Sequence, residues 1–185
     1  MKPPKPSPET VLRSYLHAKD ENRPHLLKHV FAHDAELVIS NKSASISFPA
    51  LTHGREAIAE VLVRSFGMTY ENVYSFYLAA PPSSVAEYTC NWLVAMSERA
   101  SNQVRVGCGS YVWSFQSGAP FLAHRLAITI EVMQVLPAVQ FEPVIVWLEA
   151  LNYPWSSAAS ALQGLPAIPE LSPIAQYLGR NGSVA

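Results

Sequence analysis

Apolar residues recur at helical spacing in the first third of the chain. Ser7, Pro8 and Glu9 are typical of a helix start, with a capping hydroxyl, a proline in the first turn and an early acid. A helical stripe follows at Leu12, Tyr15, Leu16 and Lys19. The sequence Asp20-Glu-Asn-Arg-Pro24 ends this pattern. A short second helix is then predicted by Leu26, Leu27, Val30 and Phe31.

The pattern next changes to strand spacing and briefly back again. Residues 34–39 predict a first strand, and residues 43–48 are its candidate hairpin partner. A third helix is predicted over 55–66, ending at Gly67, because glycine commonly caps a helix C-terminus.

The middle of the chain consists of long strand-like runs. They are rich in Val, Tyr, Trp, Phe and Thr, and they cover residues 72–79, 85–97, 103–116 and 121–136. Turn residues such as Pro81-Pro82 and Ser117-Gly118 separate them. Helices followed by an antiparallel meander predict an α+β fold.

The last 49 residues have a different character. Prolines recur from Pro137 to Pro173, and short helices are predicted over 144–151, 156–163 and 172–178. The segment is too apolar for a free linker. We therefore expect a disordered segment at 1–7, a domain at 8–136, and an extension at 137–185 that packs on the domain or on a partner subunit.

The composition points to concealed apolar surface. Hydrophobic residues make up 49% of the 185 residues and charged residues 15%, below the usual share of about 25%. Such a chain is expected to hide apolar surface in a pocket or in a homodimer interface. The net charge of −1 argues against a nucleic-acid partner.

The same residues argue against several other classes of protein. The first eight residues contain no apolar leader, and the chain contains no apolar run of about 18 residues. Cytoplasmic location without membrane contact is the expectation. Cys90 and Cys108 both lie in predicted strands, which favours small buried thiols over a disulfide.

Three features together resemble a known superfamily. They are Tyr15, the pair Asp34-Ala35, and the run His53-Gly54-Arg55-Glu56-Ala57-Ile58. Over residues 9–136 the sequence is similar to the nuclear transport factor 2-like superfamily, in its SnoaL/ketosteroid-isomerase group. The resemblance implies a cone-shaped, curved antiparallel sheet packed on three N-terminal helices around a small-molecule pocket. The extension at 137–185 is atypical of that group.

The resemblance also implies positions for catalytic groups. The base of ketosteroid isomerases, an aspartate, falls on Ile39, which cannot exchange a proton. Their oxyanion donors fall on Tyr15 and Tyr111. Two phenols could polarise a carbonyl, or they could be amphipathic side chains that fill a cavity. Isomerase activity of the usual kind is not expected.

His124 is a further candidate for acid–base work. Period-two alternation places it with Leu122, Leu126 and Ile128 on an apolar strand face. If that face lines the pocket, the imidazole is the best candidate for a general base. A structural histidine is the alternative, and a β-bulge would turn the side chain outward.

Three more histidines, His25, His29 and His33, are spaced four apart. This spacing can bind zinc on a helix, but no further ligand is assured, so exposed histidines are favoured. No phosphate-binding or nucleotide-binding motif occurs, and no cofactor is expected.

Two functions remain open. One is cofactor-free dehydration, isomerisation or cyclisation of an apolar molecule by His124, Tyr15 and Tyr111. The other is a non-catalytic ligand-binding or dimerisation module with a degenerate active site, whose extension closes or occupies the pocket.

Overall fold

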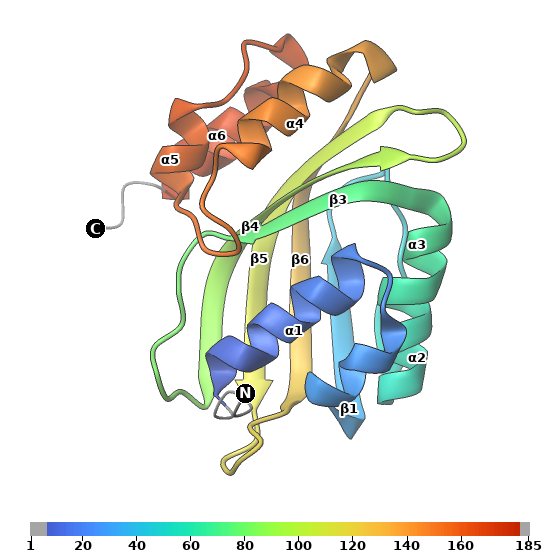
Figure 1. Cartoon of the computed structure of the whole chain (residues 1–185), viewed down its shortest axis with the longest axis vertical. Coiled ribbons are helices and arrows are strands. Elements are labelled where there is room, and N and C mark those ends of the chain that lie inside the picture. Colours follow the sequence, from blue (N-terminus) through green and yellow to red (C-terminus); the bar gives the residue numbers. More distant parts are fainter. Residues whose placement is uncertain (1–6, 182–185) are drawn as a thin grey trace, which may run out of the picture.

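The computed structural model describes residues 7–181, and its first helix begins as the sequence predicts. Helix α1 spans Pro8–Asp20. Ser7 and Thr10 cap it reciprocally, since each side chain accepts a hydrogen bond from the other's backbone N–H. Of the predicted disordered segment 1–7, residues 1–6 lie outside the described residues. Figure 1 shows α1 lying across the strands of the sheet.

The other two N-terminal helices differ in detail from the prediction. The second is a 3₁₀ helix, η1, at Pro24–His29. The third runs continuously through α2 (Arg55–Ala59), the π-helical turn η2 (Glu60–Ser65) and α3 (Phe66–Thr69). Gly67 therefore does not end the helix. A Cβ there would lie 2.8 Å from the Asn22 side chain, so this glycine permits close packing instead.

Six strands form one sheet, in the order β2-β1-β6-β5-β4-β3. Their bounds are β1 Phe31–Asn41, β2 Leu51–His53, β3 Tyr70–Tyr77, β4 Glu87–Glu98, β5 Val104–Phe115 and β6 Ala123–Leu136. The sheet is mixed, because β1 and β6 are parallel whereas all the other neighbours are antiparallel. The expectation of an entirely antiparallel sheet is wrong on this point. After β1 and β2 the chain crosses to β3 at the opposite edge of the sheet and returns through β4, β5 and β6. Strand β6 therefore lies beside β1 and runs parallel to it.

The hairpin partner of β1 also differs from the prediction. Strand β2 pairs with β1 through Leu37 and Thr52, whereas residues 43–48, the predicted partner, have no regular secondary structure. The segment 42–50 is held differently. The Ser45 hydroxyl donates to the Met133 carbonyl at 2.7 Å, and Arg105 donates to the Ser45 carbonyl.

Two β-bulges interrupt β6. Ser114 and Phe115 pair with Arg125 and Ala123, which leaves His124 as an extra residue, and Cys108 and Gly109 pair with Val132 and Ile130, which leaves Glu131 as another. Each bulge reverses which side chains face inward, and bulges also bend a strand.

The sheet separates two hydrophobic clusters. Its inner face packs on α1 and on the 55–69 helix, with Trp92, Tyr111 and Trp113 at the centre. Its outer face carries Phe76, Leu93 and other apolar side chains. Helices α4 (Phe141–Glu149), α5 (Ala158–Gln163) and α6 (Ser172–Asn181), with the short turns η3 (Ala138–Gln140) and η4 (Pro169–Leu171), cover that outer cluster.

The extension is thus built into the molecule, and Figure 1 shows α4–α6 grouped at one end of the sheet. Trp147 and Leu148 are buried, and the Trp147 indole donates to the Ala161 carbonyl at 2.9 Å. The extension also covers an edge strand, because Tyr77 N donates to Pro154 O at 2.9 Å. Pairing an exposed edge in this way blocks unwanted strand addition.

Candidate functional site

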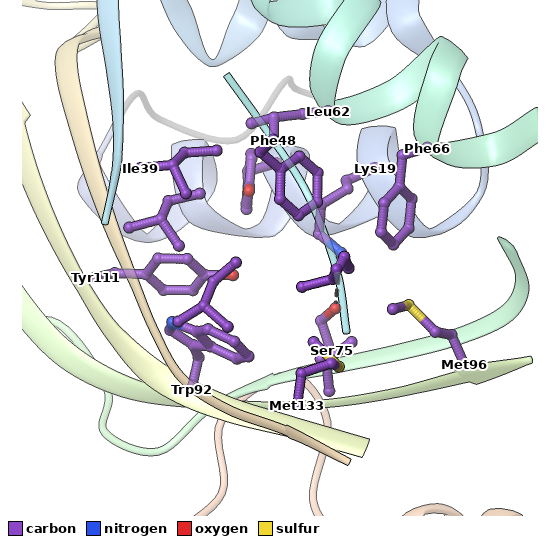
Figure 2. A pocket seen from close by; sticks show the side chains of 15 residues that line it. Lys19, Ile39, Phe48, Leu62, Phe66, Ser75, Trp92, Met96, Tyr111 and Met133 are labelled. Atoms are coloured by element: carbon purple, nitrogen blue, oxygen red, sulfur yellow. Dashed lines mark hydrogen bonds between the residues drawn. The ribbon is translucent and has the colours of Figure 1, made fainter. Parts of the chain in front are cut away.

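A cavity lies between the inner face of the sheet, α1, the 55–69 helix and the segment 42–50. The cavity volume is about 60 Å³. The lining side chains come from distant parts of the chain and are mostly apolar (Figure 2): Tyr15, Lys19, Ile39, Ile46, Phe48, Leu62, Phe66, Ser75, Trp92, Val94, Met96, Tyr111, Ile128, Ile130 and Met133.

Both predicted tyrosines line this cavity. The rings of Tyr15 and Tyr111 meet edge to face, with centroids 6.2 Å apart. Burial raises the pKa of both phenols, and the nearby Asp20 carboxylate raises the pKa of Tyr15 further. Both hydroxyls therefore stay protonated at neutral pH and act as hydrogen-bond donors rather than as bases.

A buried ionic cluster on the cavity wall is the main feature that was not predicted. The Lys19 amine lies 2.5 Å from Asp20 Oδ1 and donates to Ser75 Oγ at 2.8 Å. Ser75 Oγ donates to Asp20 Oδ1 at 3.0 Å, and Ser75 N donates to Asp20 Oδ2 at 2.9 Å. Figure 2 shows Lys19 and Ser75 meeting at the cavity.

The position of Lys19 in the sequence could have indicated this cluster. It lies four residues after Tyr15 on the apolar stripe of α1, where a solvated lysine is not expected. The lysine is only 7% exposed, and charged groups are rarely buried without a partner. The partner Asp20 is adjacent in sequence, but Ser75 is 56 residues away and no local pattern connects them.

The polar atoms of the cavity wall provide more donors than acceptors. Within residues 7–181, Tyr15 Oη and Trp92 Nε1 are buried and have no hydrogen-bond partner. An unpartnered buried donor is costly, and both of these residues line the cavity. A bound molecule with an acceptor atom would satisfy them.

Ile39 and His124 bear on acid–base chemistry. Ile39 lines the cavity at the position where the resemblance places the isomerase base. His124 is exposed and does not line the cavity, because the bulge at this residue turns it away from the inner face. Of the two placements that the sequence left open for His124, the structure shows the outward one, which the β-bulge produces.

The remaining histidine candidates lie outside the site. His25, His29 and His33 are all exposed. In the described part of the chain, no cluster of three or more His, Cys, Asp or Glu side chains is placed to hold a metal ion.

Within residues 7–181, no helix is both long and apolar enough to span a bilayer.

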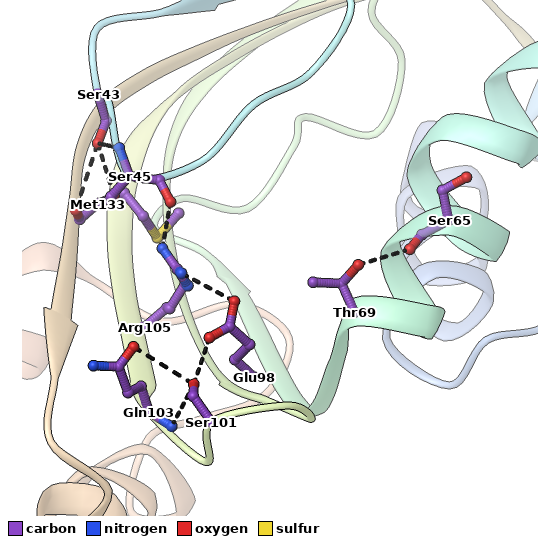
Figure 3. Close-up of polar contacts among 9 residues, drawn as sticks. All are labelled: Ser43, Ser45, Ser65, Thr69, Glu98, Ser101, Gln103, Arg105 and Met133. Atoms are coloured by element: carbon purple, nitrogen blue, oxygen red, sulfur yellow. Dashed lines mark hydrogen bonds and ion pairs between the residues drawn. The ribbon is translucent and has the colours of Figure 1, made fainter.

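The segment 42–50 closes one side of the cavity with Ile46 and Phe48. Figure 3 shows the polar contacts that hold it in place. Arg105 donates to the Ser45 carbonyl and forms an ion pair with Glu98 at 3.1 Å. Glu98 is also bonded by the Ser101 hydroxyl. The β4–β5 hairpin therefore anchors the segment that forms this wall.

Solved structures provide the comparison for this geometry, since no protein-family model and no curated protein matches the sequence. An NTF2-like superfamily protein from Salmonella enterica serovar Typhimurium LT2 aligns with a TM-score of 0.54 at 17% identity, over 67% of this chain and 88% of that one. A protein with a ketosteroid isomerase-like fold from Catenulispora acidiphila, in complex with trimethylamine, aligns at 0.52 and 16%, over 66% and 85%. The Type2 hexachlorocyclohexane dehydrochlorinase LinA aligns at 0.53 and 15%, over 68% and 84%.

The chain therefore has the NTF2-like fold, with an additional helical extension. The alignments cover about two thirds of the chain. At this identity the comparison establishes the fold, and the chemistry has to be argued from the cavity itself.

Proposed function

We propose that the protein binds a compact, apolar small molecule that carries a hydrogen-bond acceptor such as a carbonyl oxygen. The observation that carries the proposal is an apolar cavity whose polar wall atoms are mainly donors. Tyr15 Oη and Trp92 Nε1 have no partner among the described residues, and Lys19 supplies an amine. Apolar pockets with a few placed polar groups are the usual form of small-molecule sites.

The charge balance of the cavity favours a neutral ligand. The Lys19 amine and the Asp20 carboxylate already neutralise each other at 2.5 Å. A carboxylate ligand would add an uncompensated charge to a buried apolar site, which is costly. A ketone or an aldehyde would accept hydrogen bonds without that cost.

The cavity volume limits the size of the ligand. An engineered apolar cavity of about 150 Å³ holds one benzene molecule, whereas this cavity measures about 60 Å³. A molecule of a few heavy atoms fits the observed shape. A larger molecule requires Ile46 and Phe48 to move with the segment 42–50.

Binding without turnover fits the site better than acid–base catalysis. His124 lies outside the cavity, Ile39 has no exchangeable proton, and the phenols remain protonated. Tyr15 and Tyr111 could polarise a bound carbonyl by donating hydrogen bonds to its oxygen. This is the role that the family resemblance implies for them in an enzyme. Of the sequence-predicted residues, none supplies a base at the cavity.

A matched pair of probes tests the proposal. Butanone and n-pentane have similar size, but only butanone has an acceptor. The expected result is a saturable change in tryptophan emission with both compounds, because Trp92 lines the cavity, with tighter binding of butanone. Tyr15→Phe should weaken butanone binding roughly three- to tenfold, as expected for one hydrogen bond of about 0.5–1.5 kcal/mol, and should leave pentane unaffected. Equal affinity for the two probes, or no binding of either, would overturn the proposal.

We also propose that two copies of the chain pair through the part of the outer sheet face that α4–α6 leave uncovered. This part lies over β1 and β6, where Val38 and Ala127 are paired and half-buried. The low charged fraction of the chain supports such an interface. Light scattering should give twice 20.3 kDa, and Ala127→Arg should reduce the mass to that of one chain. A single-chain mass for the unaltered protein would refute the proposal.

A further inference from the structure

Lys19 differs from the other described lysines in its surroundings. Its side chain is buried at the cavity wall, and the amine lies 5.1 Å from the centre of the Phe66 ring. Lys28 and Lys42 are exposed, and Lys42 forms an ion pair with Glu131. An amine in an apolar pocket is the usual setting of a lysine that reacts with carbonyl compounds.

The neighbours of Lys19 can handle the protons that such a reaction moves. Asp20 Oδ1 is 2.5 Å from the amine and can accept a proton from it. Ser75 bonds both groups and holds the carboxylate in place through its backbone N–H. Tyr15 and Tyr111 line the same cavity with protonated hydroxyls that can donate to a carbonyl oxygen.

We propose that Lys19 forms an imine with a compact aldehyde or ketone bound in the cavity. This proposal rests on the proposed binding of a carbonyl ligand. The Lys19 ammonium passes a proton to Asp20, and the neutral nitrogen attacks the carbonyl carbon to give a carbinolamine. The C–O bond then breaks, the oxygen leaves as water with the proton returned from Asp20, and a C=N bond forms. The product is a protonated imine opposite the Asp20 carboxylate, so atoms and charge balance.

The site suits this chemistry for a further reason. Attack on a carbonyl places negative charge on its oxygen, and buried donors stabilise that charge strongly in a site that excludes water. The unpartnered hydroxyl of Tyr15 is such a donor. The exposed amines of Lys28 and Lys42 have no comparable cavity around them.

Reductive trapping tests the proposal on the full chain. Propanal or butanone is incubated with the protein and sodium cyanoborohydride, which reduces an imine to a stable secondary amine. Peptide mapping by mass spectrometry then locates the added mass. The expected result is labelling of Lys19 at least tenfold faster than of Lys28 or Lys42. Labelling of the exposed lysines with Lys19 unmodified would overturn the proposal.

Two variants test whether the labelling depends on Lys19 and on its neighbour Asp20. Asp20→Asn preserves the side-chain shape but removes the proton acceptor, so labelling of Lys19 should slow at least tenfold. Lys19→Arg keeps the positive charge and should abolish the cavity adduct. Circular dichroism of both variants, compared with the unaltered chain, shows whether they fold, and the mapping of the unaltered chain decides the proposal if either does not.

Butanone binding without reductant separates the two proposals. If fluorescence shows saturable binding while Lys19 stays unlabelled, the imine is wrong and the binding function stands. If butanone does not bind, both proposals fail together.

Discussion

Lys19 and Asp20 are buried side by side at the end of α1, and they set the polarity of the cavity. Their side chains are 8% and 5% exposed. Removing both charges from water is expensive, and their mutual attraction plus the bonds to Ser75 offset that cost. Such a pair contributes little net stability, but removal of one partner leaves the other charge buried without a counter-ion.

A double-mutant comparison tests this account of the pair. Lys19→Met should lower the free energy of unfolding by about 3 kcal/mol, because Asp20 then remains buried without its counter-ion. The double variant Lys19→Met/Asp20→Asn should be more stable than Lys19→Met alone. Urea unfolding of the three proteins measures both differences. Strictly additive losses would show that the two side chains do not depend on each other.

The buried phenols predict a specific alkaline response. Burial raises the pKa of Tyr15, Tyr77 and Tyr111 above the ordinary value of about 10. The native state then holds these protons more tightly than the unfolded state does. The resulting stability is complete below about pH 10 and is lost as the pH rises through the folded pKa. Absorbance at the tyrosinate band should therefore show these tyrosines ionising only together with the unfolding seen by circular dichroism. Smooth ionisation of every tyrosine near pH 10 in the folded protein would contradict this.

At this scale the sequence predicted part of the site. Tyr15 and Tyr111 came from the resemblance and both line the cavity. Lys19 was on the correct stripe, but its role depends on Ser75, which only the folded chain brings to it. Period-two alternation placed His124 on the apolar strand face and left a bulge that turns it outward as the alternative, and the structure contains that bulge.

At the scale of elements, the bulges in β6 show why strands are easier to predict than their register. The four long strands begin and end within a few residues of the predicted bounds, because β-branched and aromatic residues extend through each run. The alternation of inner and outer side chains, however, changes at His124 and again at Glu131. Ile130 faces the cavity, and so does Met133 three residues later, which a regular strand would not allow.

Gly109 is required by the second bulge. A Cβ at this position would lie 1.9 Å from the Thr129 carbonyl oxygen and 2.8 Å from the Trp92 ring. Backbone cannot move aside cheaply, so Gly109→Ala should cost on the order of 3 kcal/mol of unfolding free energy. Gly107→Ala should cost less, because its closest neighbour is the flexible end of Met133 and the nearest backbone atom, the Val132 carbonyl oxygen, is 3.1 Å away.

Gly118 provides the matched control for this series. A Cβ there meets nothing within 4 Å, so Gly118→Ala should leave stability nearly unchanged. Urea unfolding ranks the three variants. Equal stability of Gly109→Ala and Gly118→Ala would show that strand β6 can shift to accept the side chain.

At the scale of the whole molecule, the extension provides a second core. The outer sheet face would otherwise present Phe76, Leu93 and Val106 to water, and α4–α6 bury these side chains under Val144, Trp147 and Leu148. The apolar composition of residues 137–185 indicated packing either on the domain or on a partner subunit. Which face of the sheet the extension covers could not be predicted from the sequence. The bulges in β6 change which of its side chains point to the outer face.

Truncation after Leu136 tests how far the domain depends on this second core. It would expose the outer cluster, and each large apolar side chain left in water forgoes roughly 1.5–3 kcal/mol. It would also remove the Pro154 carbonyl that pairs with Tyr77 and so uncover an edge strand. We expect aggregation or a large fall in Tm, measured by differential scanning calorimetry and light scattering. Trp147→Ala in the full chain is the milder companion, with an expected loss of about 3–5 kcal/mol because the indole is buried and bonded to Ala161. A truncated protein that does not aggregate and has an unchanged Tm would show that the sheet is stable without the extension on its outer face. The 8–136 domain would then be able to fold alone, and the extension would have to be explained by something other than the stability of the sheet.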